Sequence, residues 1–280
     1  MTRFDSLLAV IAALAAPRIS AETSAPSHHP HSPLFIARLS PKVLVPPASG
    51  NASGTGAFVL TSDDNRRVRL SYDLTYASLR SPDIRSVALR NFSAGGNGKV
   101  VHVICGEGNA ACAPGAARTL AGSWDERSQL PLTPGLVSEL TAQRIYVEVL
   151  TGRGPELRAQ LEPQPFMAGY TQYIGRISGR SAQGPVTGTA AVWLVAIPPD
   201  KPLALVDATV AGENATLRSA RLGSLTLLKA PGLRSPTVSV RIDSKQIRGL
   251  SAAELQSPVL VFTLATDPPV EIRTPLVVVP

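Results

Sequence analysis

The stretch that decides the fold is Glu139-Leu-Thr-Ala-Gln-Arg-Ile-Tyr-Val-Glu-Val-Leu-Thr-Gly-Arg-Gly-Pro-Glu-Leu-Arg-Ala-Gln-Leu161, because a second copy follows near the C-terminus. That copy is Glu254-Leu-Gln-Ser-Pro-Val-Leu-Val-Phe-Thr-Leu-Ala-Thr-Asp-Pro-Pro-Val-Glu-Ile-Arg-Thr-Pro-Leu276, and the two align without a gap. Each copy predicts a short lead-in, an apolar β-branched strand, a Gly/Pro turn and a second strand that opens with Glu-[Leu/Ile]-Arg. The repeat predicts a tandem of one structural unit.

Weaker matches extend the repeat towards the N-terminus of each unit. Tyr173-Ile-Gly-Arg-Ile-Ser matches Phe35-Ile-Ala-Arg-Leu-Ser, and Gly188–Leu194 matches Gly54–Leu60. A further alignment pairs residues 203–222 with residues 70–89. We therefore expect two domains, at residues 34–163 and 164–280, with the seam in Glu162-Pro-Gln-Pro.

The predicted secondary structure is all-β. Val68, Leu70, Tyr72 and Leu74 alternate with polar residues, which is typical of a strand with one face in the core and one face in water. No stretch of ten or more residues keeps a helical apolar period, although Ser251-Ala-Ala-Glu254 forms a capping box for one helical turn. Short strands separated by Pro and Gly predict an antiparallel β-sandwich in each unit.

The N-terminus has the pattern of a secretory signal peptide. A basic start, an apolar run from Leu7 to Ala16 and small residues up to Ala21 predict cleavage after Ala21, with residues 1–21 removed on export. The alternative is a buried N-terminal helix. Residues 22–33 lack apolar periodicity and predict a disordered lead-in. Their histidines, His28, His29 and His31, form a cluster that can hold Zn or Cu loosely; the alternative is a solvated tail.

Charge and composition argue against a nucleic-acid protein. The chain has 27 Lys+Arg against 20 Asp+Glu, but the arginines are dispersed and aromatic residues make up only 5%. We interpret the excess as a solubility feature that leaves room for weak attraction to anionic polysaccharides or membrane surfaces. No apolar run is long enough for a transmembrane helix.

The only two cysteines, Cys105 and Cys112, flank a Gly-rich loop. In an exported chain this spacing predicts a local disulfide that pins the loop. A redox pair would need a Cys-x-x-Cys spacing, and a metal site would need further ligands nearby.

Several of these motifs together resemble the chordin-type domain, CHRD. They are the strand–Thr–turn–Glu-[Leu/Ile]-Arg-x-x-Leu pattern, the opening Gly54-Thr-Gly-Ala strand and the Leu70-Ser-Tyr-Asp-Leu strand. The resemblance covers residues 34–161 and, more weakly, residues 173–276. It implies two tandem Greek-key β-sandwiches, similar to copper–zinc superoxide dismutase and used as extracellular domains. In chordin such domains accompany cysteine-rich modules that bind growth factors.

The sequence departs from the family pattern at histidine positions. Many members have His-Ile-His where this chain has Ser86-Val-Ala-Leu89, and they often have Val-His-Thr where it has Val149-Leu-Thr151 and Leu264-Ala-Thr266. Only His102 remains, alone on an apolar strand, where a structural role is usual. The sequence therefore predicts no metal site in either unit and no bound cofactor.

The repeated Glu156-x-Arg158 and Glu271-x-Arg273 pairs are the strongest candidates for chemistry. They could act as an acid–base pair or an anion clamp; we instead expect cross-strand ion pairs or a polar outer face repeated with the fold. A serine nucleophile would need a histidine base, and His102 has no Gly-x-Ser-x-Gly near it. We predict that the chain is not an enzyme.

Three sequons, at Asn51, Asn91 and Asn214, fall in or beside predicted turns and are candidate N-glycosylation sites if the source has a eukaryotic secretory route. The leading functional hypothesis is an exported, non-catalytic binding or structural module that presents loops or edges to an extracellular protein or glycan. One alternative is a Cu/Zn-handling or redox protein that uses the His28/His29/His31 tail. A second alternative is an extracellular growth-factor modulator.

Overall fold

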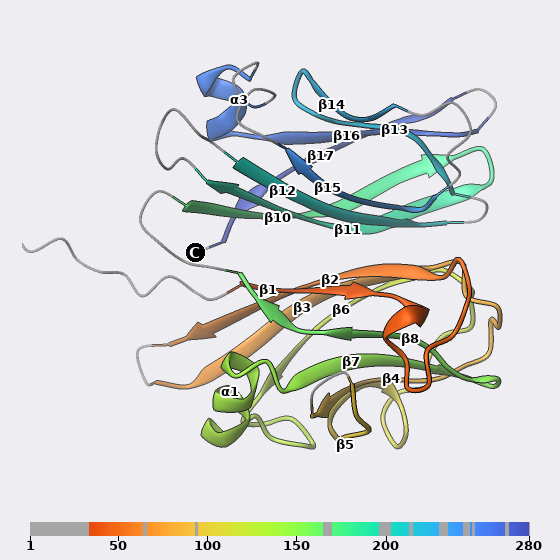
Figure 1. The fold of residues 1–280 in the computed structure, drawn as a ribbon, viewed down its shortest axis with the longest axis vertical. Helices are drawn as coiled ribbons and strands as arrows, with labels where there is room; N and C mark the ends of the chain where they lie inside the picture. The colour runs from red at the N-terminus through yellow and green to blue at the C-terminus, as the bar shows by residue number, and fades with distance from the viewer. Residues whose placement is uncertain are drawn as a thin grey trace, which may run out of the picture. The chain divides into compact units, whose positions relative to one another are not determined.

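Each half of the chain contains one five-stranded and one four-stranded β-sheet, and the sheets of the two halves have matching strand orders (Figure 1). The computed structural model describes residues 34–63, 66–92, 95–164, 170–195, 203–212, 215–229, 235–242, 247, 250–266 and 269–279. The predicted signal peptide and the histidine-rich lead-in lie outside the described residues, and the described residues belong to one compact unit.

The first half folds into two antiparallel sheets. The five-stranded sheet has the order β6-β3-β2-β1-β9, with bounds β1 Leu34–Leu39, β2 Ser53–Ser62, β3 Val68–Ala77, β6 Arg118–Asp125 and β9 Glu162–Pro163. The four-stranded sheet has the order β5-β4-β7-β8, with bounds β4 Ile84–Asn91, β5 Lys99–Gly106, β7 Ile145–Thr151 and β8 Gly154–Gln160. A single turn of 3₁₀ helix, η1 (Pro41–Val43), follows β1.

The second half repeats this arrangement strand for strand. Its five-stranded sheet has the order β15-β12-β11-β10-β18, with bounds β10 Tyr170–Ser181, β11 Gly184–Val195, β12 Leu203–Ala211, β15 Thr237–Ile242 and β18 Val277–Val278. Its four-stranded sheet has the order β14-β13-β16-β17, with bounds β13 Leu217–Leu222, β14 Leu225–Lys229, β16 Val259–Leu264 and β17 Glu271–Pro275. The all-β sandwich prediction is confirmed, whereas the Greek-key, dismutase-like topology stays a prediction.

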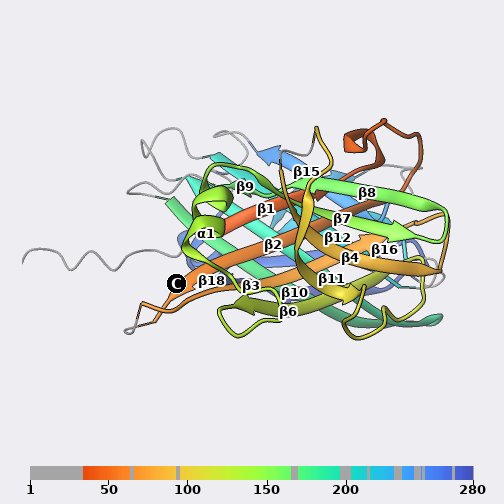
Figure 2. The same ribbon diagram turned by 90° about the horizontal axis from the view of Figure 1, so that it is seen from below.

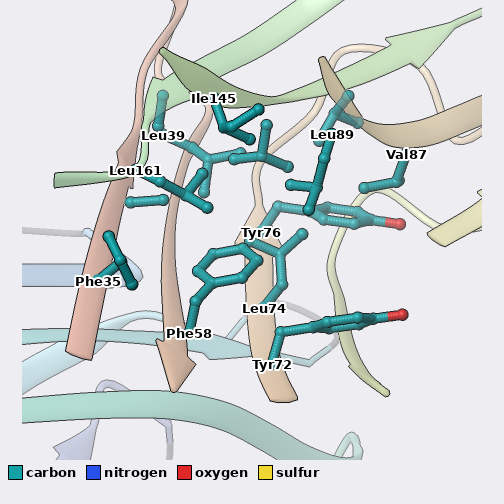
Figure 3. Close-up of a cluster of buried hydrophobic side chains, with 14 of the residues drawn as sticks. Phe35, Leu39, Phe58, Tyr72, Leu74, Tyr76, Val87, Leu89, Ile145 and Leu161 are labelled. Carbon is teal, nitrogen blue, oxygen red and sulfur yellow. The ribbon is translucent and has the colours of Figure 1, made fainter. Parts of the chain in front are cut away.

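In each half the five-stranded and four-stranded sheets pack face to face. Figure 3 shows the first core, in which Phe58 and Leu74 of one sheet point towards Leu89 and Ile145 of the other. All four side chains are fully buried. The apolar positions predicted from the alternation in β3 fill this core, because successive side chains on a strand point to opposite faces.

A short helix precedes the repeated hairpin in both halves. The capping box predicted at Ser251 is present at the start of α3 (Ala252–Gln256). The sequence analysis did not predict the corresponding helix of the first half, α1, which spans Pro134–Thr141. Thr133 caps it by accepting a hydrogen bond from the Leu136 N–H, and Pro134 occupies the first turn. Thr-Pro is a helix-start signal, but eight residues are too few to show a helical apolar period.

The structure corrects the β3–β12 part of the alignment of residues 203–222 with residues 70–89 by one position. Asp73 pairs with Ala57 in β2, and Asp207 pairs with the equivalent Ala191 in β11. Asp73 therefore corresponds to Asp207, and not to the neighbouring Val206. A one-residue slip would move every buried side chain of the strand to the opposite face.

The outer face of β3 is only partly in water, contrary to the prediction: Arg69 is exposed, but the face becomes buried towards the C-terminal end of the strand. Thr75 on this face is fully buried, and its hydroxyl lies 2.8 Å from that of Thr189 in β11. The two five-stranded sheets face each other (Figure 1), and their strands overlap when they are viewed from below (Figure 2). A small apolar cluster that includes Ile36, Ala57 and Ala191 contributes to the contact between them. The second sandwich covers part of the β3 face that the alternation predicts to lie in water.

Candidate functional site

The two cysteines form the predicted disulfide at the end of β5. The Cys105–Cys112 bond has an S–S distance of 2.07 Å and a Cα–Cα distance of 5.0 Å. Inside the loop, the Gly106 N–H donates to the Ala110 carbonyl at 2.8 Å. Gly106 adopts φ +80, and a Cβ there would lie 2.0 Å from the Arg85 carbonyl oxygen, so the turn requires glycine. The prediction that the disulfide pins a local loop is confirmed.

Glu156 anchors a loop from inside the protein. Its side chain is 1% exposed, so the expected polar outer face is wrong for this residue. One carboxylate oxygen accepts the Arg80 backbone N–H at 2.7 Å, and the other accepts the Thr151 hydroxyl at 2.9 Å. Arg80 lies in the loop between β3 and β4, and a charge-assisted bond to its backbone fixes that loop against β8.

Arg158, two residues further along β8, anchors a second loop. It forms the expected cross-strand ion pair with its register partner Glu148, with Nε 3.0 Å from the carboxylate. Its remaining donors bind the Gly96 carbonyl and the Asn97 side chain, both at 2.9 Å, and its guanidinium lies 4.6 Å from the centre of the Tyr146 ring. The β4–β5 loop thereby covers the ion pair.

The same charges in the second sandwich remain at the surface. Arg273 donates to Glu271 at 2.9 Å, and Arg221 donates to the same carboxylate at 3.0 Å. All three side chains are well exposed. The polar-outer-face interpretation is therefore confirmed for the second copy of the motif, and the loop-anchoring function belongs to the first.

His102 is a core residue. It is 7% exposed, its ring stacks on Trp124 at 5.3 Å, and it meets Tyr72 edge-on at 5.9 Å. Its Nε2 has no hydrogen-bond partner. Desolvation lowers the pKa of His102 to about 4, against a smaller opposing effect of Asp125, so the imidazole is neutral at physiological pH.

The sequons differ in accessibility. Asn51 is exposed between η1 and β2, and Asn91 is half-buried as the last residue of β4, so both lie in or beside turns as expected. Asn214 lies outside the described residues, as do His28, His29 and His31. Metal handling by that histidine tail therefore stays a prediction. Within the described ranges, no three His, Cys, Asp or Glu side chains gather in a group suited to a metal ion.

A groove of about 750 Å³ with a polar lining lies beside the contact between the five-stranded sheets. Its lining comes from three segments that are distant in sequence: the residues before β2, the β3–β4 loop and the start of β15. The polar side chains that line it are Asn51, Ser53, Ser78, Arg80, Ser235, Thr237 and Ser239. Ser78 adopts φ +60, a left-handed conformation that is uncommon for serine.

The groove was not predicted, because its residues carry no motif. Serine, asparagine and a single arginine are ordinary loop residues, and only the fold brings the three segments together. Glu156 was the one signal within reach of sequence analysis, since its carboxylate holds the backbone of Arg80 at the groove wall.

A second groove, of about 450 Å³, lies at the other end of β3. Arg67, Arg69, Asp125 and Arg127 line it, but Arg67 is paired with Asp63 and Arg69 with Asp125. Its charges largely satisfy one another.

The helices within the described ranges fall short of the apolar length needed to cross a bilayer.

Comparison with known proteins bears on the first sandwich. The family model of the CHRD domain matches residues 35–161, which run from β1 through β8. Comparison with curated proteins and with solved structures found no match for this chain. The matched range contains the disulfide loop, Glu156 and Arg158. The first sandwich of this chain therefore belongs to the CHRD domain family.

Proposed function

We propose that the chain is an exported, non-catalytic binding module that recognises an extracellular glycan through the groove lined by Asn51, Ser78, Arg80 and Ser239. The CHRD match and the disulfide support an extracellular setting. The observation that carries the proposal is the chemistry of the groove: hydroxyl and amide side chains with one guanidinium.

This chemistry suits an acidic oligosaccharide. Hydroxyl and amide groups exchange hydrogen bonds with sugar hydroxyls, and an arginine binds a carboxylate or sulfate with two parallel bonds. Arg80 and Ser78 are exposed, and none of the described residues that line the groove is acidic and could compete for the guanidinium. The dispersed positive charge of the chain favours the same class of ligand.

The buried Glu156 supports the site by holding the loop that carries Arg80. A loop fixed before binding loses less conformational entropy when the ligand arrives. The anchoring bonds to the Arg80 N–H and the Thr151 hydroxyl are both shorter than 3 Å. In this proposal, the Glu of the repeated motif supports recognition and has no catalytic function.

The experiment is isothermal titration calorimetry of the purified chain with uronic-acid oligosaccharides, sulfated oligosaccharides and neutral oligosaccharides of equal length. Arg80→Ala should weaken binding of the acidic sugars by tenfold or more. Arg127→Ala is the matched control, since it removes an exposed arginine from the second groove, and it should change the affinity less than twofold.

Asn51→Gln should be tested in parallel, because a glycan on Asn51 would itself enter the groove. No binding of any acidic sugar by the Asn51→Gln chain, or equal losses in Arg80→Ala and Arg127→Ala, would refute the glycan proposal. A protein partner would then be sought with the same Arg80→Ala variant as the negative control.

A further inference from the structure

Several polar interactions across the contact between the two five-stranded sheets occur twice. Arg38 in β1 binds Asp207 in β12, with Nε–Oδ1 at 2.9 Å and a second bond at 2.7 Å. Arg176 in β10 binds Asp73 in β3 at 2.7 Å. Arg38 pairs with Thr55 in β2, and Arg176 pairs with the equivalent Thr189 in β11. The two salt bridges therefore join equivalent positions with the halves exchanged.

The threonine hydroxyl contacts between the two sheets also occur twice, with the halves of the chain exchanged. Thr55 meets Thr209 at 2.9 Å, and Thr75 meets Thr189 at 2.8 Å. The register places Thr75 opposite Thr55 and Thr209 opposite Thr189, so these contacts are equivalent with the halves exchanged. All four side chains are at most 1% exposed.

A second hydroxyl pair extends the pattern to the edge strands. Ser53 contacts Thr237 at 2.8 Å, and Thr119 contacts Thr187 at 2.9 Å. Thr119 in β6 lies opposite Thr75 in β3, and Thr237 in β15 lies opposite Thr209 in β12 in the same way. The apolar part matches too, because Ile36 and Ala57 of the first sheet occupy the positions of Ile174 and Ala191 in the second.

Contacts that occur twice with exchanged halves define an isologous interface, which is the geometry of a two-fold homodimer. Each sheet face therefore carries both partners of each of these repeated contacts. We infer that the outer face of the first five-stranded sheet is a self-recognition surface whose fitting partner is the same face of another copy of this chain. Within one chain the second sandwich occupies this surface.

The like-with-like contacts follow directly from the register. Between two first sandwiches, Arg38 of each copy meets Asp73 of the other, and Thr55 meets Thr75. Between two second sandwiches, Arg176 meets Asp207, and Thr189 meets Thr209. The two faces differ at one position beside the aspartate: Ser239 of the second sheet donates to Asp207 at 2.6 Å, whereas Ala121 stands at the equivalent position in the first sheet.

The test reverses the charges of one face in the full chain. In the double variant Arg176→Asp/Asp207→Arg, Arg38 faces an arginine and Asp73 faces an aspartate, so the intrachain contact is repelled. Like faces stay complementary, both between first sandwiches and between second sandwiches. We expect the molar mass measured by sedimentation equilibrium to double relative to the wild-type chain.

The quadruple variant Arg38→Asp/Asp73→Arg/Arg176→Asp/Asp207→Arg is the matched control. It restores opposite charges within the chain and should return the mass to that of one chain. Circular dichroism of each variant reports whether it is folded. A double variant that is monomeric, or that unfolds while the quadruple variant is folded, overturns the inference, and so does a quadruple variant that dimerises.

Discussion

At the scale of single residues, the same motif has different functions in its two copies because its surroundings differ. Arg158 is 2% exposed and contacts Glu148, Gly96 and Asn97, whereas Arg273 lies at the surface beside Glu271. A charge removed from water needs full compensation, and a charge at the surface does not. The effect of a substitution therefore depends on the copy in which it is made.

We expect Arg158→Met to destabilise the protein by about 3 kcal/mol, because it leaves the buried Glu148 carboxylate short of its main partner. Arg273→Met is the matched control and should cost less than about 1 kcal/mol, as for other exposed ion pairs. Urea unfolding followed by circular dichroism measures both. Similar losses in the two variants would show that burial of the first pair has no energetic consequence.

His102 makes stability depend on pH. Because burial lowers the pKa of His102 from 6.5 to about 4, the unfolded chain binds the proton more readily than the folded chain. The contribution of neutral His102 to stability is complete above about pH 6.5 and is lost as the pH falls towards 4. The shift corresponds to roughly 3 kcal/mol.

The measurement is urea unfolding of the wild-type chain and of His102→Phe, which keeps a ring against Trp124, between pH 7.5 and pH 4. The variant should lose less stability than the wild type across this interval, because it has no group to protonate at that position. Parallel pH profiles would mean that His102 does not contribute to acid sensitivity.

At the scale of elements, β8 positions two loops with alternate side chains of one strand face. Glu156 holds the β3–β4 loop, and Arg158 holds the β4–β5 loop. The core side of the same strand carries Leu157, which is fully buried. A single strand thereby joins the core to the β3–β4 loop, which lines the proposed binding groove, and to the β4–β5 loop.

We expect Glu156→Gln to increase the hydrogen-exchange rate of the Arg80 amide by tenfold or more, since the charge-assisted bond to that N–H becomes a weaker neutral one. Glu271→Gln, at the equivalent position of the second sandwich, should leave the Arg80 amide unchanged. Exchange followed by mass spectrometry on peptides covering residues 78–84 tests this. Unchanged protection in Glu156→Gln would contradict the anchoring function.

At the scale of the whole molecule, the two salt bridges across the sandwich contact are equivalent in position but unequal in burial. The Arg38 and Asp207 side chains are 38% and 6% exposed, whereas those of Arg176 and Asp73 are 66% and 17% exposed. Asp207 also has Ser239 as an additional donor. Solvent screens the second pair more strongly than the first.

Double-mutant cycles should therefore give a larger coupling energy for Arg38 and Asp207 than for Arg176 and Asp73. We expect about 1–2 kcal/mol for the first pair and less than about 1 kcal/mol for the second. Alanine variants of each residue and each pair, compared by urea unfolding, supply the two values. Equal couplings would show that the additional burial and the Ser239 bond do not matter.

Much of the fold could be predicted from the sequence because it depends on local alternation and on the repeat. The predicted strand over Val68–Leu74, the capping box at Ser251 and the Cys105–Cys112 disulfide are all present. The α1 helix was missed because it is shorter than the window that a helical period needs. The groove was missed because its lining comes from three unconnected loops.

The sequence by itself determined the all-β class, the duplication and the local disulfide, because strand alternation, repeat spacing and cysteine spacing are properties of neighbouring residues. Only the tertiary structure decided which polar residues are buried. Thr75 and Asp73 have the pattern of a solvated face, and Glu156 and Arg158 have the pattern of an outer strand face. In the structure, the second sandwich covers Thr75 and contacts Asp73, and loops cover Glu156 and Arg158. Burial by segments that are distant in sequence leaves no trace in local sequence periodicity.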